Sequence, residues 1–449
     1  MKLFNSLFEK ITTQDKKRII KNFNSNIINN FARVLVQLFF PLLMIKIYGL
    51  EAFGIWIFLI SLPDLFYILN LDFNSATKTE ISIFHNQNKL KKVKSYFINF
   101  AYLNYLIFII FLPLTLLIIS NINIQIEFIK TINTNDIDLI LFLIISSFFL
   151  NFIISVLDVG ISFKGNLYIS NNLNSFFDIF SKILILLFGL YNNSILYASI
   201  AYFTSNIIKV LCYYIYFKLE NNKFSLFSTS KFNIHTIIKI FKLSLPYYLI
   251  SISTLIKHSY QIIIIGIFFG PNIVGLISTL KTLFYFLPIR VWSIVQRSII
   301  YEFTKLYSKN NFFILKKKYI LFIKICLFFS LIFLFFSFLF GANLYNFWIG
   351  NKYLFYSKEI IYLIVLDVAF YIIANSFNHL QKAINRFYNF SLFLFFINLF
   401  IIFIIYLSFA IGLTYFTMFI FNLIGSFSLA IFSVYEFKKS IKYNFNHKK

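Results

Sequence analysis

The chain alternates between long apolar runs and short polar connections. A helix needs about 20 apolar residues to cross the hydrocarbon of a bilayer, and lipid offers no partners to unpaired backbone groups. We therefore predict that twelve runs of suitable length form transmembrane helices. They are Asn26–Tyr48, Glu51–Phe73, Tyr96–Ser120, Ile137–Val159, Leu173–Tyr191, Ile195–Lys218, Leu243–Phe269, Val274–Ile300, Tyr319–Phe340, Lys358–Phe377, Phe387–Ala410 and Leu413–Phe437.

Two segments about 220 residues apart share one plan. Gly49 and Gly54 join two apolar runs, and Gly270 and Gly275 repeat the same spacing in the second half. A repeat of this kind indicates a duplicated architecture. We predict two bundles of six helices each, and because six is even, both bundles enter the membrane in the same orientation as parallel repeats.

The polar connections alternate between basic and nearly uncharged, and an excess of Lys and Arg marks the cytoplasmic side. Both termini are therefore expected in the cytoplasm. The end of the linker, Asn233–Lys242, is either a short amphipathic helix on the inner leaflet or a solvated connector. The expected domains are a cytoplasmic N-terminal segment (1–25), an N-terminal six-helix bundle (26–218), a cytoplasmic linker (219–242), a C-terminal six-helix bundle (243–437) and a cytoplasmic tail (438–449).

Composition supports the same class of protein. Hydrophobic residues make up 59% of the chain and charged residues 13%, whereas soluble chains average about 45–50% and 25%. The fold class is thus an all-α polytopic membrane protein with the lipid bilayer as its solvent. The formal charge of +25 gathers in the connections of one side, so it reflects orientation and indicates no nucleic-acid partner. Cys212 and Cys326 lie in apolar runs, which suits small buried side chains.

Several ionisable residues fall inside the predicted helices, where each costs at least about 2.5–3.5 kcal/mol and marks a functional site by default. Lys257 lies roughly 20 Å inside Gly270, and Arg33 lies at a similar depth inside Gly49. Several such residues together favour a hydrated internal cavity. We predict that a cationic, substrate-binding set lines it, namely Arg33, Lys257, Lys209, Lys281 and Arg290.

The acidic residues at membrane depth allow two roles. Asp64 and Asp367 either neutralise these cations or carry a coupling H⁺ or Na⁺, and the sequence leaves both roles open. Asp178 precedes Lys182 by four residues, which predicts a local pair on one helix face. The chain has no Walker A motif and no metal-ligand spacing of His, Cys and carboxylates. We therefore expect no enzyme, no catalytic residues and no cofactor beyond a coupling ion.

Local motifs resemble those of a known family. Tyr48–Trp56 (YGLEAFGIW) is similar to the LG-x-x-x-[FY]-G-x-[WY] segment of polysaccharide-transport (Wzx-type O-antigen or oligosaccharide) flippases of the multidrug/oligosaccharidyl-lipid/polysaccharide exporter (MOP) superfamily. Leu71–Ala76 resembles the family's D-[LF]-G stretch, with Asn74 in place of the usual Gly. Gly270–Gly275 and Leu380–Arg386 look like the counterparts in the second half.

The resemblance implies two six-helix bundles in a MATE-like V around a cationic cavity. It also implies a flippase that moves an O-antigen or capsule repeat unit on undecaprenyl pyrophosphate across the bacterial cytoplasmic (inner) membrane, toward lipopolysaccharide or surface polysaccharide. Alternating access, ion-gradient coupling, and polymerase and chain-length proteins as partners are part of that expectation.

Three other functions stay open. A drug or cation exporter of the same architecture would favour cavity carboxylates. A membrane glycosyltransferase or polymerase would need a large outer loop, and Asn121–Asp136 and Gly341–Ser357 are short. A non-transporting scaffold would explain the duplication but not the paired cations.

Overall fold

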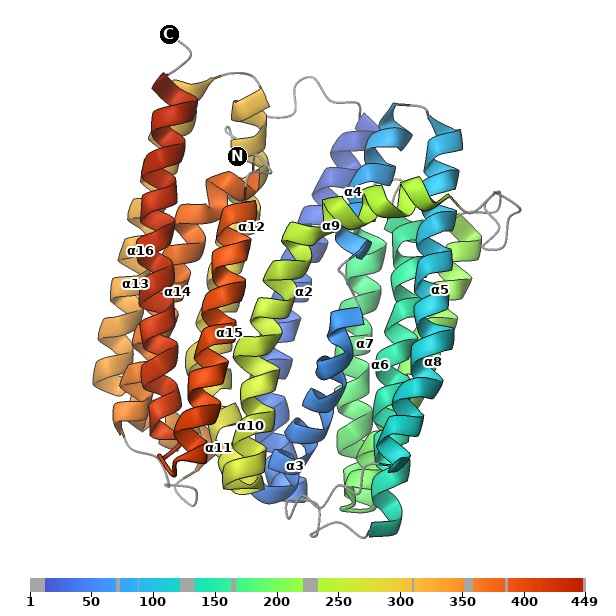
Figure 1. Cartoon of the computed structure of the whole chain (residues 1–449), viewed down its shortest axis with the longest axis vertical. Coiled ribbons are helices and arrows are strands. Elements are labelled where there is room, and N and C mark those ends of the chain that lie inside the picture. The colour runs from blue at the N-terminus through green and yellow to red at the C-terminus, as the bar shows by residue number, and fades with distance from the viewer. Residues whose placement is uncertain are drawn as a thin grey trace. The chain divides into compact units, whose positions relative to one another are not determined.

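The chain folds into long α-helices, and the described residues contain no strand (Figure 1). This structure, a computed structural model, describes residues 13–69, 73–87, 89–121, 134–162, 167–220, 233–308, 311–350, 358–383 and 387–446. The helices are α2 (Thr13–Tyr48), α3 (Leu50–Ser61), the 3₁₀ helix η1 (Leu62–Leu69), α4 (Phe73–Asn86), α5 (Leu90–Asn121), α6 (Thr134–Ser162), α7 (Leu167–Tyr191), α8 (Ile195–Glu220), α9 (Ile234–Leu255), the π-helical turn η3 (Ile256–Tyr260), α10 (Gln261–Phe269), α11 (Pro271–Lys281), the π-helical turn η4 (Thr282–Phe286), α12 (Leu287–Ser308), α13 (Phe312–Ile349), α14 (Lys358–Ala383), α15 (Tyr388–Ala410) and α16 (Phe416–Asn446).

Eleven continuous helical segments in the described part of the chain are long and apolar enough to span a membrane. The remaining predicted span, Glu51–Phe73, coincides with α3 followed by η1. Each of these two is short, but they follow one another without a break from Leu50 to Leu69. The predicted class, an all-α polytopic membrane protein, is confirmed.

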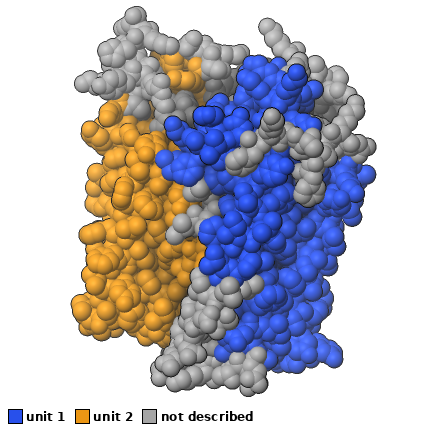
Figure 2. All heavy atoms as spheres, turned by 45° about the vertical axis from the view of Figure 1, so that its right-hand side comes forward, with its two compact units in different colours: residues 1–36, 68–245 blue, residues 37–67, 246–449 orange. Residues whose placement is uncertain are grey.

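The helices form two compact units, coloured separately in Figure 2. Unit 1 comprises Met1–Val36 and Ile68–Leu245, and unit 2 comprises Gln37–Tyr67 and Pro246–Lys449. The second part of α2 and all of α3 thus pack with the C-terminal helices. The bundle boundaries expected from the sequence stay a prediction about functional domains.

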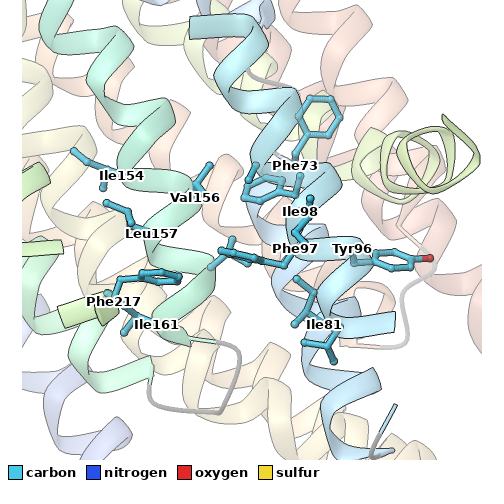
Figure 3. Packing of buried hydrophobic residues seen from close by; sticks show 14 of the residues in the cluster. Phe73, Ile81, Tyr96, Phe97, Ile98, Ile154, Val156, Leu157, Ile161 and Phe217 are labelled. Atoms are coloured by element: carbon cyan, nitrogen blue, oxygen red, sulfur yellow. The ribbon is translucent and has the colours of Figure 1, made fainter. Parts of the chain in front are cut away.

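The core of unit 1 joins α4, α5, α6 and α8 (Figure 3). Phe97 of α5 stacks on Phe217 of α8 with ring centroids 5.9 Å apart, and Phe73 and Ile81 bring α4 onto the same cluster. The amphipathic α4 begins at the end of the predicted span Glu51–Phe73 and occupies much of the basic connection that leads to the next predicted span, Tyr96–Ser120. Hydropathy did not predict it as a helix, because only one of its faces is apolar.

The start of α9 includes the stretch Asn233–Lys242, for which two structures were open. Residues from Ile234 onward are helical, and Ile240 is buried in the hydrophobic core of unit 1. The ring of Phe241 also lies 6.4 Å from that of Phe73. The stretch is therefore helical, but it forms the start of the long α9 rather than a separate short helix. Its position on a leaflet stays a prediction.

Unit 2 contains a reciprocal contact between the two copies of the glycine motif. Gly49 and Gly270 both have positive φ, 90° and 80°, and begin α3 and α11, which pack on each other. A Cβ on Gly54 would lie 1.9 Å from the backbone oxygen of Pro271, and a Cβ on Gly275 would lie 2.8 Å from that of Leu50. Because Leu50 and Pro271 each follow the first glycine of their motif, the contact is reciprocal. It supports the duplication inferred from the sequence.

Candidate functional site: polar clusters at membrane depth

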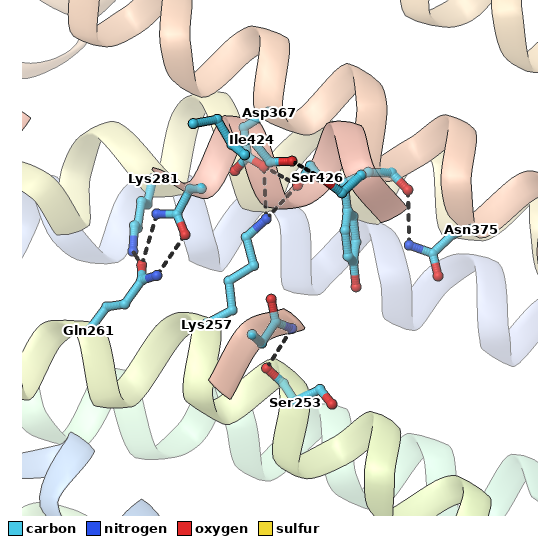
Figure 4. Close-up of polar contacts among 12 residues, drawn as sticks. Ser253, Lys257, Gln261, Lys281, Asp367, Asn375, Ile424 and Ser426 are labelled. Atoms are coloured by element: carbon cyan, nitrogen blue, oxygen red, sulfur yellow. Dashed lines mark hydrogen bonds and ion pairs between the residues drawn. The ribbon is translucent and has the colours of Figure 1, made fainter. Parts of the chain in front are cut away.

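An ion pair lies in the interior of unit 2 (Figure 4). Lys257, on the π-helical turn η3, places Nζ 2.8 Å from Oδ1 of Asp367 on α14 and donates to Oγ of Ser426 on α16, also at 2.8 Å. Ser426 donates to the same Asp367 oxygen. Both charged side chains are only 6% exposed. Asp367 is therefore the counter-ion of Lys257, which is one of the two roles that the sequence left open for it.

Aromatic rings and a second lysine complete this interior. Nζ of Lys257 lies 5.2 Å from the ring centroid of Tyr285 and 5.1 Å from that of Tyr371, in the range of cation–π attraction. Lys281 is buried too, and its Nζ donates to Oε1 of Gln261 at 3.0 Å. The Gln261 amide in turn donates to Oδ1 of Asn422 at 2.7 Å. Lys281 is thus held by neutral amides, whereas Lys257 is held by a carboxylate.

Both lysines lie at irregular turns of their helices. Lys257 is part of η3, and Lys281 immediately precedes η4. π-Helical turns occur frequently at functional sites, because they widen the helix and redirect side chains. Sequence periodicity does not predict such turns, so the depth of these residues could be counted along the chain but their local geometry could not.

The other predicted coupling residue, Asp64, contacts the same π-helical turn that carries Lys257. Asp64, in the 3₁₀ helix η1, accepts a hydrogen bond from the hydroxyl of Ser259. Ser259 is two residues beyond Lys257 on η3, so the two candidate carboxylates of unit 2 bind different residues of one short turn. Asp367 accepts from the Lys257 ammonium, whereas Asp64 accepts from the neutral hydroxyl of Ser259. A coupling role for either carboxylate stays a prediction.

Unit 1 contains a more open cluster of charges. Nε of Arg33 lies 3.1 Å from Oδ2 of Asp178, and the two side chains are 30% and 45% exposed. One turn away, Asn29 donates to Asn172 at 2.9 Å, which joins α2 to α7 again.

Lys209 on α8 lies within electrostatic reach of both Arg33 and Asp178. Lys209 also lies within electrostatic reach of Asp158, but Lys78 neutralises that carboxylate. The group of Arg33, Lys209 and Asp178, called the Arg33 cluster below, is therefore net positive, and its salt bridge is half-exposed.

Several sequence predictions stay open. Asp178, whose local pairing with Lys182 stays a prediction, forms a salt bridge with Arg33 of another helix. The proposed cavity shared by Arg33 and Lys257 joins residues of different units, and it stays a prediction. Arg290 is half-buried on α12, and its part in substrate binding also stays a prediction.

A buried carboxylate that the sequence analysis did not single out fastens the helices of unit 1. Asp158 of α6 is 5% exposed and pairs with Lys78 of α4. Asn74 of α4 and Ser162 of α6 donate to it at 3.2 and 3.3 Å, and Ser170 of α7 donates as well. The spacing of Asn74 and Lys78, four residues apart on one helix face, was the available signal.

Comparisons with known proteins place the fold. No protein-family model matches the chain, and no curated protein matches it by sequence. Among solved structures, an inward-facing multidrug resistance MATE family transporter of the MOP superfamily has a TM-score of 0.63 at 15% identity, covering 93% of this chain and 100% of its own. The lipid II flippase MurJ, in an inward closed conformation, has a TM-score of 0.66 at 15% identity, covering 92% of this chain and 87% of its own.

A third structure is described as having a binding pocket of reversed polarity that suggests a different function. It is a MOP superfamily transporter from Pyrococcus furiosus, with a TM-score of 0.55 at 15% identity, covering 95% of this chain and 94% of its own. At these identities the likeness concerns the fold. The chain has the fold of the MATE and MOP superfamily transporters.

Proposed function

We propose that this protein is a MOP-type flippase that moves an oligosaccharide linked to undecaprenyl pyrophosphate across the bacterial cytoplasmic membrane by alternating access. The Arg33 cluster carries the proposal. A pyrophosphate is anionic, and a net-positive, half-exposed cluster at membrane depth attracts it. Arginine is suited to the contact because its planar guanidinium donates two hydrogen bonds to one phosphate.

The fold supports the transport part of the proposal, since MATE transporters and a lipid II flippase have a similar chain path. The charge of the Arg33 cluster supports an anionic substrate. We assign the headgroup contact to Arg33 and Lys209, with Arg290 as a further proposed contact. Cytoplasmic termini and a polymerase and chain-length proteins as partners belong to the same proposal.

A reconstituted flipping assay tests the headgroup contact. Proteoliposomes would carry a fluorescent, short-chain glycan on polyprenyl pyrophosphate, and its movement between leaflets would be followed by quenching. A charge-assisted phosphate contact contributes about 1.5–3 kcal/mol, so Arg33→Ala should lower kcat/KM by roughly 10-fold to 150-fold. Lys46→Ala is the matched control, because Lys46 is an exposed lysine near the end of the same helix.

Equal loss of activity in both variants, or none in Arg33→Ala, would count against the headgroup assignment. Deletion in the native cell tests the function itself. The deletion strain should accumulate lipid-linked glycan on the cytoplasmic leaflet and lose the surface glycan. Normal surface glycan in that strain would reject the flippase proposal.

A second function, export of a cationic drug, is favoured by one observation. Asp64 provides a carboxylate that is bound by a hydroxyl rather than by a cation, and MATE multidrug transporters share the fold. Under this alternative, deletion should sensitise cells to ethidium-like cations, and Asp64→Asn should fail to restore resistance. Under the flippase proposal, susceptibility to such cations should not change.

A further inference from the structure

The ammonium of Lys257 is surrounded by groups that suit a bound cation. A carboxylate oxygen of Asp367 and a hydroxyl of Ser426 each lie 2.8 Å from Nζ, and the rings of Tyr285 and Tyr371 face it at 5.2 and 5.1 Å. Carboxylate and hydroxyl oxygens are ligands of hard cations, and aromatic faces attract monovalent ones. We propose that these four groups form a monovalent-cation site, called the Asp367 cage below, in which the chain's own lysine takes the place of the ion.

The Asp367 cage is built by other elements than the one that carries the lysine. Asp367 and Tyr371 lie on α14, Ser426 lies on α16 and Tyr285 lies on η4. Ser426 donates to the Asp367 oxygen that also contacts the ammonium, which fixes the carboxylate in place. Removing the lysine side chain therefore leaves an ordered carboxylate at a depth where an unpaired charge is costly. Such a site should take up a small cation from solution.

Tethering decides which cation occupies the site in the natural chain. An intramolecular ligand has an effective concentration of at least about the millimolar range, and Lys257 is further held by its burial in the unit. Because the ammonium already neutralises Asp367, a Na⁺ ion would have to displace it. Asp367 is therefore not a Na⁺ site in the natural chain. If the proposed function and its ion coupling hold, Asp64 is the remaining coupling carboxylate of the two.

Lys281 supplies a matched control within the same interior. It is buried like Lys257, but its ammonium donates to the neutral amide of Gln261. Removing it uncovers no carboxylate, so Lys281→Gln should create no cation dependence. Lys281 does lie within electrostatic reach of Asp367. A Lys257→Ala/Lys281→Gln variant therefore tests whether the second lysine turns to the vacated carboxylate.

Thermal unfolding of the purified full chain in detergent measures occupancy without any transport step. The salts are NaCl, LiCl and methylammonium chloride, each compared with N-methyl-D-glucamine chloride at equal ionic strength. The natural chain and Lys281→Gln should melt at the same temperature in all four. Lys257→Ala and the double variant should melt higher in one or more small-cation salts, with a shift that grows with the logarithm of cation concentration.

Absence of any small-cation response in both Lys257→Ala and the double variant overturns the proposal, as does an equal response in the natural chain. If Lys257→Ala does not fold, Lys257→Ala/Asp367→Asn decides. This variant should fold better than Lys257→Ala and show no cation dependence, because no carboxylate remains to be neutralised. If Lys257→Ala/Asp367→Asn is no more stable than Lys257→Ala, the proposal is overturned. These readouts stay valid whether or not the chain proves to be a flippase.

Discussion

The contact between Gly54 and Pro271 makes a sharp prediction about helix packing. A Cβ at Gly54 would lie 1.9 Å from a backbone oxygen, which is 1.5 Å short of the 3.4 Å at which ordinary contact begins. A backbone atom cannot rotate away as a side chain can. α3 and α11 must therefore move apart, and overpacking of this kind costs about 1–3 kcal/mol or more. Gly54→Ala should lower the stability of unit 2 despite the better helix propensity of alanine.

Two other glycines calibrate the effect, because each lies within a helix and gains the same propensity from alanine. A Cβ at Gly275 would lie 2.8 Å from the oxygen of Leu50, only 0.6 Å short of ordinary contact. A Cβ at Gly425 would meet the tip of the Ile401 side chain, which can move. Melting temperatures should therefore fall in the order Gly425→Ala, then Gly275→Ala, then Gly54→Ala as the lowest. A Gly54→Ala variant that melts at or above the natural chain would refute the close backbone contact.

Three further predictions follow from polar contacts. Asp158→Asn leaves the Lys78 ammonium, whose side chain is 25% exposed, without its counter-ion and should destabilise the chain by about 1–3 kcal/mol, seen as a lower melting temperature. Asp178→Asn frees Arg33 from its salt bridge and should tighten binding of a polyprenyl pyrophosphate by up to about 5-fold, since a half-exposed pair contributes at most about 1 kcal/mol. Ser376→Ala removes the acceptor of the buried Trp292 indole N–H and should lower the free energy of unfolding by about 1–3 kcal/mol.

Matched variants separate these effects from general damage. Asp138→Asn removes an exposed carboxylate from the same helix as Asp158 and should leave the melting temperature unchanged. Ser433→Ala removes a buried hydroxyl that donates to its own helix, at Leu429, and should cost less than Ser376→Ala. Glu51→Gln removes an exposed carboxylate on α3 and should not alter binding of the pyrophosphate. Weaker binding by Asp178→Asn would contradict the assigned role of Arg33.

The predicted spans agree with the structure because lipid imposes one strong rule. Apolar runs must become helices, so a run such as Tyr319–Phe340 lies wholly within α13. The irregular segments η1, η3 and η4 were beyond the sequence, since a 3₁₀ or π-helical turn leaves the apolar pattern unchanged. The duplication was visible in two glycine pairs. Their direct contact was not, because spacing along the chain does not say which copies of a motif meet.

The sequence marked individual residues at membrane depth, but it did not say which charges pair with each other, for a physical reason. Depth in the membrane can be counted along a helix, and it marked Lys257 and Asp367 as costly residues. Which charge neutralises which depends on how helices more than 100 residues apart rotate against each other. Local spacing predicted Lys182 as a partner of Asp178, and it did not predict that Arg33 of another helix binds the same carboxylate.

The two units hold their intramembrane charges in different ways, and this bears on selectivity. In unit 2 the charge of Lys257 is neutralised by Asp367 inside the protein, so it contributes little field at a distance. In unit 1 Asp158 is neutralised by Lys78. Arg33 and Lys209 together outnumber the remaining carboxylate Asp178, whose salt bridge is half-exposed. The net positive charge of the Arg33 cluster should therefore decide whether the protein prefers anionic or cationic substrates. Reversing charge at Arg33 should change which substrates are favoured, whereas removing the Lys257 charge should chiefly change stability and its cation dependence.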